Sequence, residues 1–131
     1  MSLGESATSL GKVRGLGSAG VGGEHWIKER MTSAALIGLS IWFLASILWL
    51  PSLDQKTIGE WLRAPTGAVP MALFIILNFI HAVEGTKSWI YDYFHDDGNR
   101  FAAHLILVFA AVLGSAFALF ALAKIAFGTH P

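Results

Sequence analysis

The chain has 131 residues, of which 54% are hydrophobic and 14% charged, and its formal net charge is zero. A water-soluble domain carries about 25% charged residues, so the deficit indicates that much of the surface faces lipid. Zero net charge gives no electrostatic reason to expect a nucleic acid as partner, and the lack of cysteine excludes disulfides, thiolate metal sites and cysteine nucleophiles, which leaves five histidines as soft metal ligands.

Residues 1–30 form a polar segment that is rich in glycine. A secretory signal peptide needs an apolar stretch soon after a positively charged start, and here the first apolar run begins only near Thr32. We therefore predict no signal peptide, and we expect residues 1–30 to lie outside the bilayer on its cytoplasmic side.

Residues 31–127 contain three apolar runs, at about 32–50, 66–90 and 101–124, and residues 128–131 form a C-terminal tail. Each run is long enough to cross a hydrocarbon core, where only a helix satisfies its own backbone hydrogen bonds. Pro51 ends the first run, and the stretch from there to Pro65 is interpreted as a loop. The predicted fold class is an all-α membrane protein with three transmembrane helices and a polar, Gly-rich N-terminal segment.

Basic residues near the ends of the runs predict the orientation in the membrane. Four of them precede the first run, namely Lys12, Arg14, Lys28 and Arg30, whereas the loop between the first two runs holds two. We therefore expect a multi-pass protein of the cell inner membrane, with the N-terminus and second loop in the cytoplasm and the C-terminus in the periplasm.

Aromatic and small residues are placed as in other membrane bundles. Ala110, Gly114 and Ala118 recur every four residues in the third run, and Ala34 and Gly38 do so in the first, which favours close helix packing. Aromatic residues near the run ends are typical of an interfacial belt: Trp26, Trp49, Trp61, Trp89, Tyr91 and Tyr93.

His81, well inside the second run, is the strongest pointer to function, because ionisable groups are costly in a bilayer. Such a histidine can hydrogen-bond another helix, relay protons or ligate haem iron, and the residues alone leave these three roles open. Gly85 shares a helix face with His81 and leaves room there for a flat macrocycle or for a closely packed helix. His81 is the only histidine deep in a run, so a six-coordinate haem would take its second axial ligand from another chain.

The segment from Trp89 to His95 follows His81 at the expected membrane surface. It places the carboxylate of Asp92 next to the hydroxyl of Tyr93. A hydroxyl beside a carboxylate can bind a carbonyl oxygen, but the aromatic residues here are also typical of simple interfacial anchoring.

The pattern from His81 to His95 resembles the second helix of the small, D-type hydrophobic membrane anchor subunit of succinate dehydrogenase, respiratory complex II. In that family a histidine is followed four residues later by glycine and eleven and twelve residues later by Asp-Tyr. Here Gly85, Asp92 and Tyr93 follow His81 at these intervals. The N-terminal part, from Gly-Lys-Val-Arg at 11–14 to Arg-x-Thr at 30–32, resembles the alphaproteobacterial and mitochondrial-related form of this subunit.

The resemblance implies roles for individual residues. His81 would be the axial ligand that this chain supplies to the iron of haem b, and the cytochrome b subunit would supply the other histidine. Arg30 would lie near the haem propionates, with His25 in the same neighbourhood. Tyr93 would donate its hydroxyl to a ubiquinone carbonyl, with Asp92 beside that site. No role carries over to other polar residues of the segment.

The implied function is that of a non-catalytic membrane anchor subunit of succinate:ubiquinone oxidoreductase, in the tricarboxylic acid cycle and the respiratory chain. Its partners would be the cytochrome b, iron–sulfur and flavoprotein subunits and membrane lipid, and we expect no succinate oxidation by this chain alone. Two alternatives stay open. One is the anchor of a related quinol:fumarate reductase, and the other is a non-redox membrane structural or assembly protein in which His81 only joins helices.

Overall fold

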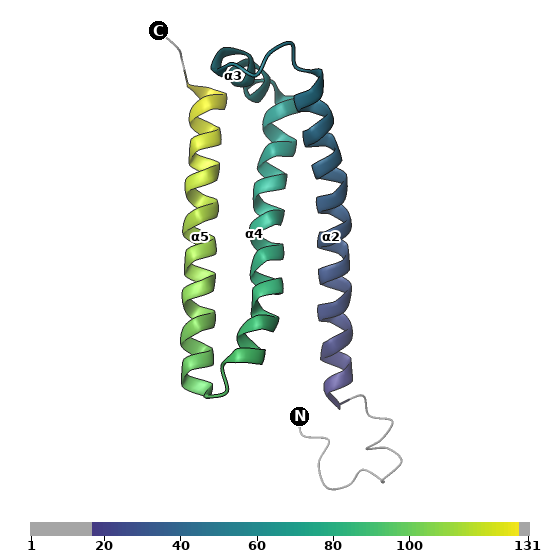
Figure 1. Ribbon diagram of the computed structural model, residues 1–131, viewed down its shortest axis with the longest axis vertical. Coiled ribbons are helices and arrows are strands. Elements are labelled where there is room, and N and C mark those ends of the chain that lie inside the picture. The colour runs from purple at the N-terminus through teal and green to yellow at the C-terminus, as the bar shows by residue number, and fades with distance from the viewer. Residues whose placement is uncertain (1–16, 129–131) are drawn as a thin grey trace, which may run out of the picture.

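The computed structural model describes residues 17–128, with side chains from Trp26 onward. This part of the chain is four α-helices with no strand, which confirms the all-α prediction (Figure 1). The helices are α2 (Gly17–Trp49), α3 (Gln55–Arg63), α4 (Pro65–Tyr93) and α5 (Asp97–Phe127).

Three of the helices, α2, α4 and α5, are long and apolar enough to cross a membrane, and within α2 the candidate span is Trp26–Trp49. The helices run beyond the apolar runs at several ends, because hydropathy marks the lipid-facing part whereas backbone hydrogen bonds carry the helix further. The start of α5 shows a local cause: the Asp96 side chain accepts a hydrogen bond from the Asn99 backbone N–H at 3.0 Å and caps the helix.

The short helix α3 lies in the segment from Pro51 to Pro65 that the apolar pattern leaves as a loop. Asp54 caps it by accepting a hydrogen bond from the Thr57 N–H at 2.7 Å, and the Ser52 hydroxyl donates to the same carboxylate at 2.6 Å. These two bonds, that from Ser52 foremost, hold the pKa of the Asp54 carboxyl below its ordinary value. The cap explains why a helix forms here without a long apolar run.

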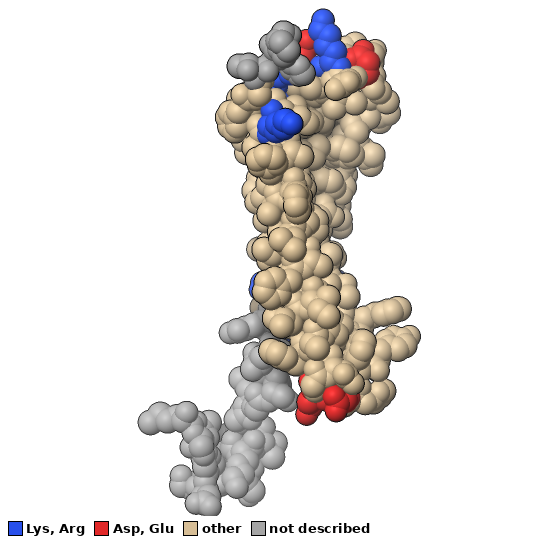
Figure 2. Space-filling model, turned by 90° about the vertical axis from the view of Figure 1, so that its left-hand side faces the viewer, with Lys and Arg blue, Asp and Glu red and all other residues tan. Residues whose placement is uncertain are grey.

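The three long helices lie side by side in one layer, with α4 between α2 and α5 (Figure 1). α4 packs against both neighbours, while α2 and α5 make at most marginal contact with each other. α3 crosses one end of the layer and packs against α4 and α5. The opposite end holds the connection between α4 and α5. The face drawn in Figure 2 carries its charged side chains mainly at these two ends.

Buried side chains are confined to the ends of the layer. The buried hydrophobic residues among the described side chains are Leu62 on α3, Leu122 near the end of α5 that packs against α3, and Ile90 near the other end of α4. Elsewhere the helices meet along narrow seams: a Cβ added at Gly114 would lie 2.8 Å from the ring of Phe79, which confirms close packing at that glycine. A Cβ at Gly38 would meet nothing within 4 Å, so this part of α2 is open.

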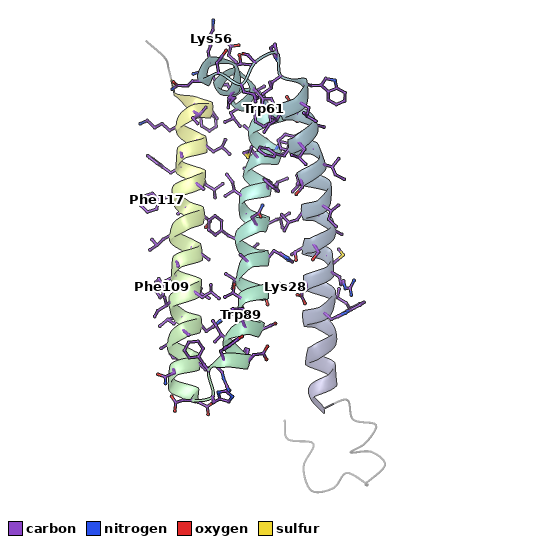
Figure 3. All side chains as sticks on the ribbon, viewed as in Figure 1. Lys28, Lys56, Trp61, Trp89, Phe109 and Phe117 are labelled. Atoms are coloured by element: carbon purple, nitrogen blue, oxygen red, sulfur yellow. The ribbon has the colours of Figure 1, made fainter. Side chains whose placement is uncertain are left out.

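Trp61 on α3 packs inside the molecule instead of pointing into the membrane interface. Its ring stacks on Trp42 at 5.6 Å between centroids and lies 6.4 Å from the ring of Phe43. Figure 3 shows Trp61 directed into the region between the helices, whereas Phe109 and Phe117 point away from the bundle. The aromatic contacts of Trp61 thus fasten α3 to α2.

Candidate functional site

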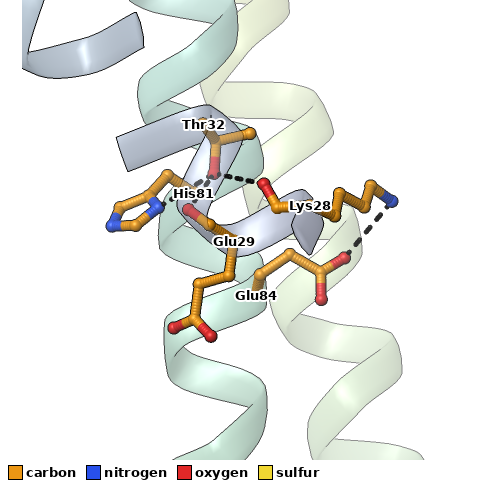
Figure 4. A network of polar contacts seen from close by, with 5 residues as sticks. All are labelled: Lys28, Glu29, Thr32, His81 and Glu84. Atoms are coloured by element: carbon orange, nitrogen blue, oxygen red, sulfur yellow. Dashed lines mark hydrogen bonds and ion pairs between the residues drawn. The ribbon is translucent and has the colours of Figure 1, made fainter. Parts of the chain in front are cut away.

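His81 lies near the middle of α4, half-buried, and contacts α2 (Figure 4). Its Nδ1 is 3.3 Å from the Oγ1 of Thr32. The Thr32 hydroxyl also lies 3.1 Å from the carbonyl oxygen of Lys28 and 3.0 Å from that of Glu29, and it donates back to its own helix as threonines often do. His81 is therefore tied to a neighbouring helix within the span.

An ion pair crosses the same interface one turn away. The Nζ of Lys28 on α2 is 3.6 Å from a carboxylate oxygen of Glu84 on α4. The Glu84 side chain is 17% exposed, whereas that of Lys28 is 64% exposed and reaches outward. α2 and α4 run in opposite directions, so this pair lies beside the contact between Thr32 and His81 (Figure 4). Together the two contacts fix the register of α2 against α4.

Gly85 lies one turn after His81 on the same helix face. A Cβ added there would meet no atom within 4 Å. The close-packing interpretation of this glycine is therefore not realised within the described chain. The backbone beside His81 is instead open to a group from outside.

A cleft of about 360 Å³ lies between α4 and α5, and Lys28 of α2 also lines it. Its walls are mainly apolar, and Lys28, Glu84 and Ser115 supply the polar atoms among its lining residues. His81, Asp92 and Tyr93 do not line it. The cleft and the predicted site residues are thus separate features of the molecule.

Arg30 and His25 belong to the N-terminal part of α2. The Arg30 guanidinium is exposed and lies over the ring of Trp26, 5.2 Å from its centroid. Because Arg30 is two residues before Thr32, it lies about 200° around the helix from the residue that contacts His81. The structure does not bring Arg30 and His81 together. The side chain of His25 lies outside the described residues.

Asp92 and Tyr93 lie in the last turn of α4, and both side chains are exposed. The Tyr93 ring packs against Trp89 with 4.8 Å between centroids. Tyr93 follows His81 by twelve residues, so the two are separated by about 18 Å along the helix. They form two separate places on one helix, one at mid-span and one at its end.

His81 is the candidate metal ligand that the described chain places at mid-span. Among the described side chains, from Trp26 to Gly128, no three His, Asp or Glu side chains gather in a way that would hold a metal ion. Histidine is one of the side chains that hold haem iron, and a haem with two histidine ligands can take one from each of two chains. A half-buried His81 beside open backbone at Gly85 fits one half of such a site.

Thr32 and the pair of Lys28 with Glu84 are the site features that the sequence interpretation missed. The polar residues themselves stand out within apolar runs, but Thr32 and His81 are 49 positions apart. Only the register between α2 and α4, which no local pattern encodes, brings them together.

These features define a class of protein: a membrane protein with three candidate spans and a half-buried histidine near the middle of the second. Residues 5–123 match the family described as succinate dehydrogenase/fumarate reductase transmembrane subunit. The chain belongs to this family, which confirms the resemblance.

Similar proteins carry the name succinate dehydrogenase hydrophobic membrane anchor subunit. That of Paracoccus denitrificans is 32% identical over 119 residues, which cover 88% of this chain and 89% of the relative. That of Rickettsia bellii is 32% identical over 82 residues, which cover 63% of this chain and 66% of the relative. No solved structure matches the chain.

Proposed function

We propose that the chain anchors a succinate:ubiquinone oxidoreductase in the membrane, holds haem b together with the cytochrome b subunit, and forms part of the ubiquinone-reducing site. The observation that carries the proposal is His81, half-buried at mid-span, with Nδ1 engaged by Thr32 and open backbone at Gly85. The names of the relatives, which are anchors of succinate dehydrogenase, support it.

His81 would hold the haem iron from one side, and a histidine of the cytochrome b subunit would hold it from the other. When bound, haem b supplies one-electron redox chemistry, while this chain supplies position and electrostatics. Arg30 would turn from Trp26 to a propionate. An exposed cation–π contact is worth about 0.5–1 kcal/mol, whereas a hydrogen bond to a charged group is worth about 1.5–3 kcal/mol. Arg30 should therefore prefer the propionate to the ring of Trp26.

Tyr93 would donate its hydroxyl to a ubiquinone carbonyl, with Asp92 beside it. Both are exposed at the end of the layer where α2 begins and α4 joins α5. We place this end in the cytoplasm, where the iron–sulfur and flavoprotein subunits would dock and deliver electrons from succinate. α3 and the C-terminus would then face the periplasm across the inner membrane, in keeping with the excess of basic residues before the first span.

The structural alternative, in which His81 only joins two helices, is favoured by one observation, the contact with Thr32. This alternative does not account for the open backbone at Gly85, because a histidine that only bridges two helices needs no free space beside it. The anchor of a quinol:fumarate reductase would use the same residues, and the names of the relatives favour succinate oxidation.

The test is to purify the chain from membranes with the subunits that accompany it and to record the visible spectrum. We expect the three partner subunits and a low-spin haem with two histidine ligands. His81→Ala should alter or abolish the haem signal, whereas His95→Ala, which removes an exposed histidine, should not. A complete complex without haem, or with the same haem in His81→Ala, would contradict the proposal.

A further inference from the structure

We infer that Thr32 is a positioning residue that holds His81 as the Nδ1–H tautomer and so presents the bare Nε2 to the haem iron. This inference rests on the proposed function, since it assigns a task to Thr32 only if His81 is a ligand. Its basis is the arrangement of one hydroxyl proton among three possible acceptors in the contact between α2 and α4 (Figure 4).

The Thr32 hydroxyl has a single proton to donate. The carbonyl oxygens of Lys28 and Glu29 lie 3.1 and 3.0 Å from Oγ1, closer than the Nδ1 of His81 at 3.3 Å. The proton is therefore used within α2 in a bond shared between the two carbonyls, an arrangement common in helices. Oγ1 is then left with lone pairs toward His81, so the Nδ1 of His81 must be the donor.

A neutral imidazole has one N–H, so a proton on Nδ1 leaves Nε2 with a free lone pair. This is the form that a metal requires, because the ring nitrogen that binds it must be unprotonated. The opposite tautomer would place hydrogen on Nε2 and block ligation. Thr32 thus selects the competent form before any iron arrives, as hydrogen-bond acceptors behind metal-bound histidines do elsewhere.

The position of Thr32 is itself held by the neighbouring ion pair. Lys28, whose carbonyl accepts the Thr32 proton, extends its Nζ to Glu84, one turn after His81. A shift of α2 along α4 would break the ion pair and the contact between Thr32 and His81 at the same time. Glu84, 17% exposed, thereby has a structural task beside the site.

The test compares Thr32→Val, which keeps the side-chain shape and removes the hydroxyl, with Thr32→Ser, which keeps the hydroxyl. Ser33→Ala is the matched control. The Ser33 hydroxyl also donates to the Glu29 carbonyl, at 2.8 Å, and this bond lies within α2, whereas Thr32 also contacts His81 on α4. All variants are made in the full complex. Haem retention and the midpoint potential of the haem are measured for each.

Thr32→Val should weaken haem retention about tenfold, at the lower end of what lost partners of metal-binding histidines cost. It should also favour reduction of the haem by up to about tenfold, or about 59 mV for a one-electron couple, because the Nδ1–H loses the acceptor that strengthens Nε2 as an electron donor. Thr32→Ser and Ser33→Ala should both match the parent complex.

An unchanged potential and haem content in Thr32→Val would overturn the inference and leave the proposed function intact, provided His81→Ala loses the haem. Equal effects in Ser33→Ala would overturn it too, since they would point to a general disturbance of α2. If Thr32→Val does not assemble, pulsed electron paramagnetic resonance is recorded on the parent complex and on Thr32→Ser. Absence of a hydrogen-bonded proton on Nδ1 of His81, the ring nitrogen that faces away from the iron, would then overturn the inference. A parent complex without haem overturns both proposals.

Discussion

Gly85→Leu is the change that separates a haem-binding face from a face that only meets lipid. Within the described chain the first added carbon is free of conflict, because a Cβ at Gly85 meets no atom within 4 Å. Leucine also favours a helix interior over glycine by close to 1 kcal/mol, so the chain itself should fold at least as well. A loss of haem in a variant of normal helicity would therefore point to a group outside the described chain.

If a macrocycle lies against Gly85, the four added carbons occupy its place. Overfilling a close-packed contact costs about 1–3 kcal/mol, which corresponds to about 5- to 150-fold weaker haem retention. If lipid lies there, the acyl chains move aside and haem content stays unchanged. The two environments thus predict results that differ by at least severalfold.

The assay is the ratio of haem to protein in the purified complex, with helicity and subunit composition measured on the same sample. Gly59→Leu is the matched control: Gly59 is equally free of neighbours within 4 Å but lies on α3 at the other end of the molecule. Normal haem content in a fully assembled Gly85→Leu complex would refute the placement of haem against this face of α4.

Three further predictions concern the ends of the spans. Tyr93→Phe should lower quinone reduction about 5- to 10-fold, the worth of one hydrogen bond of about 1–1.5 kcal/mol, while succinate oxidation with an artificial dye and haem content stay normal; an equal loss in Tyr91→Phe would argue against a specific role. Arg30→Glu should weaken haem retention by placing a carboxylate near the propionates, and unchanged haem content would exclude that role. Because the pKa of Asp54 is lowered in the folded chain, its support of α3 is present above the ordinary pKa and is lost as pH falls through the lowered one. Faster amide hydrogen exchange in α3 is expected for Asp54→Ala at neutral pH but not for Asp54→Asn, which keeps a cap, and equal protection in all three proteins would show that the cap is dispensable.

The three spans could be predicted from hydropathy because the bilayer imposes one local rule, that a long apolar run must be a helix. Hydropathy does not predict α3, because the residues that start this helix are polar. Asp54 lies three residues before Thr57 and accepts from its N–H, and the Ser52 hydroxyl donates to the same carboxylate. A search for capping residues, independent of apolar runs, would have found it.

Candidate site residues were predicted one at a time, and their neighbours were not. His81 stands out because a titratable group inside an apolar run is costly in a bilayer and is rarely present without a function. Thr32 does not stand out, because threonine is common near the start of a span and donates to its own helix without any function. Its importance depends on the antiparallel register of α2 and α4, which arises from packing along both helices.

The pattern of polar groups argues that a partner chain covers one particular stripe of α4. An exposed leucine or phenylalanine in a membrane protein does not indicate a partner chain, because lipid covers apolar surface as well as a protein does. Asn78 is different: it is exposed, and its amide donates to the Phe74 carbonyl at 2.9 Å, but lipid offers its remaining polar atoms no partners. Asn78, His81 and Gly85 follow one another at helical spacing, so the polar amide, the histidine and the open backbone share one side of the helix. Within the described chain α2 reaches this stripe at His81, through Thr32, and the single layer of α2, α4 and α5 leaves no further helix to cover the rest. Under the proposed function, the chain that would supply the second haem ligand would lie there.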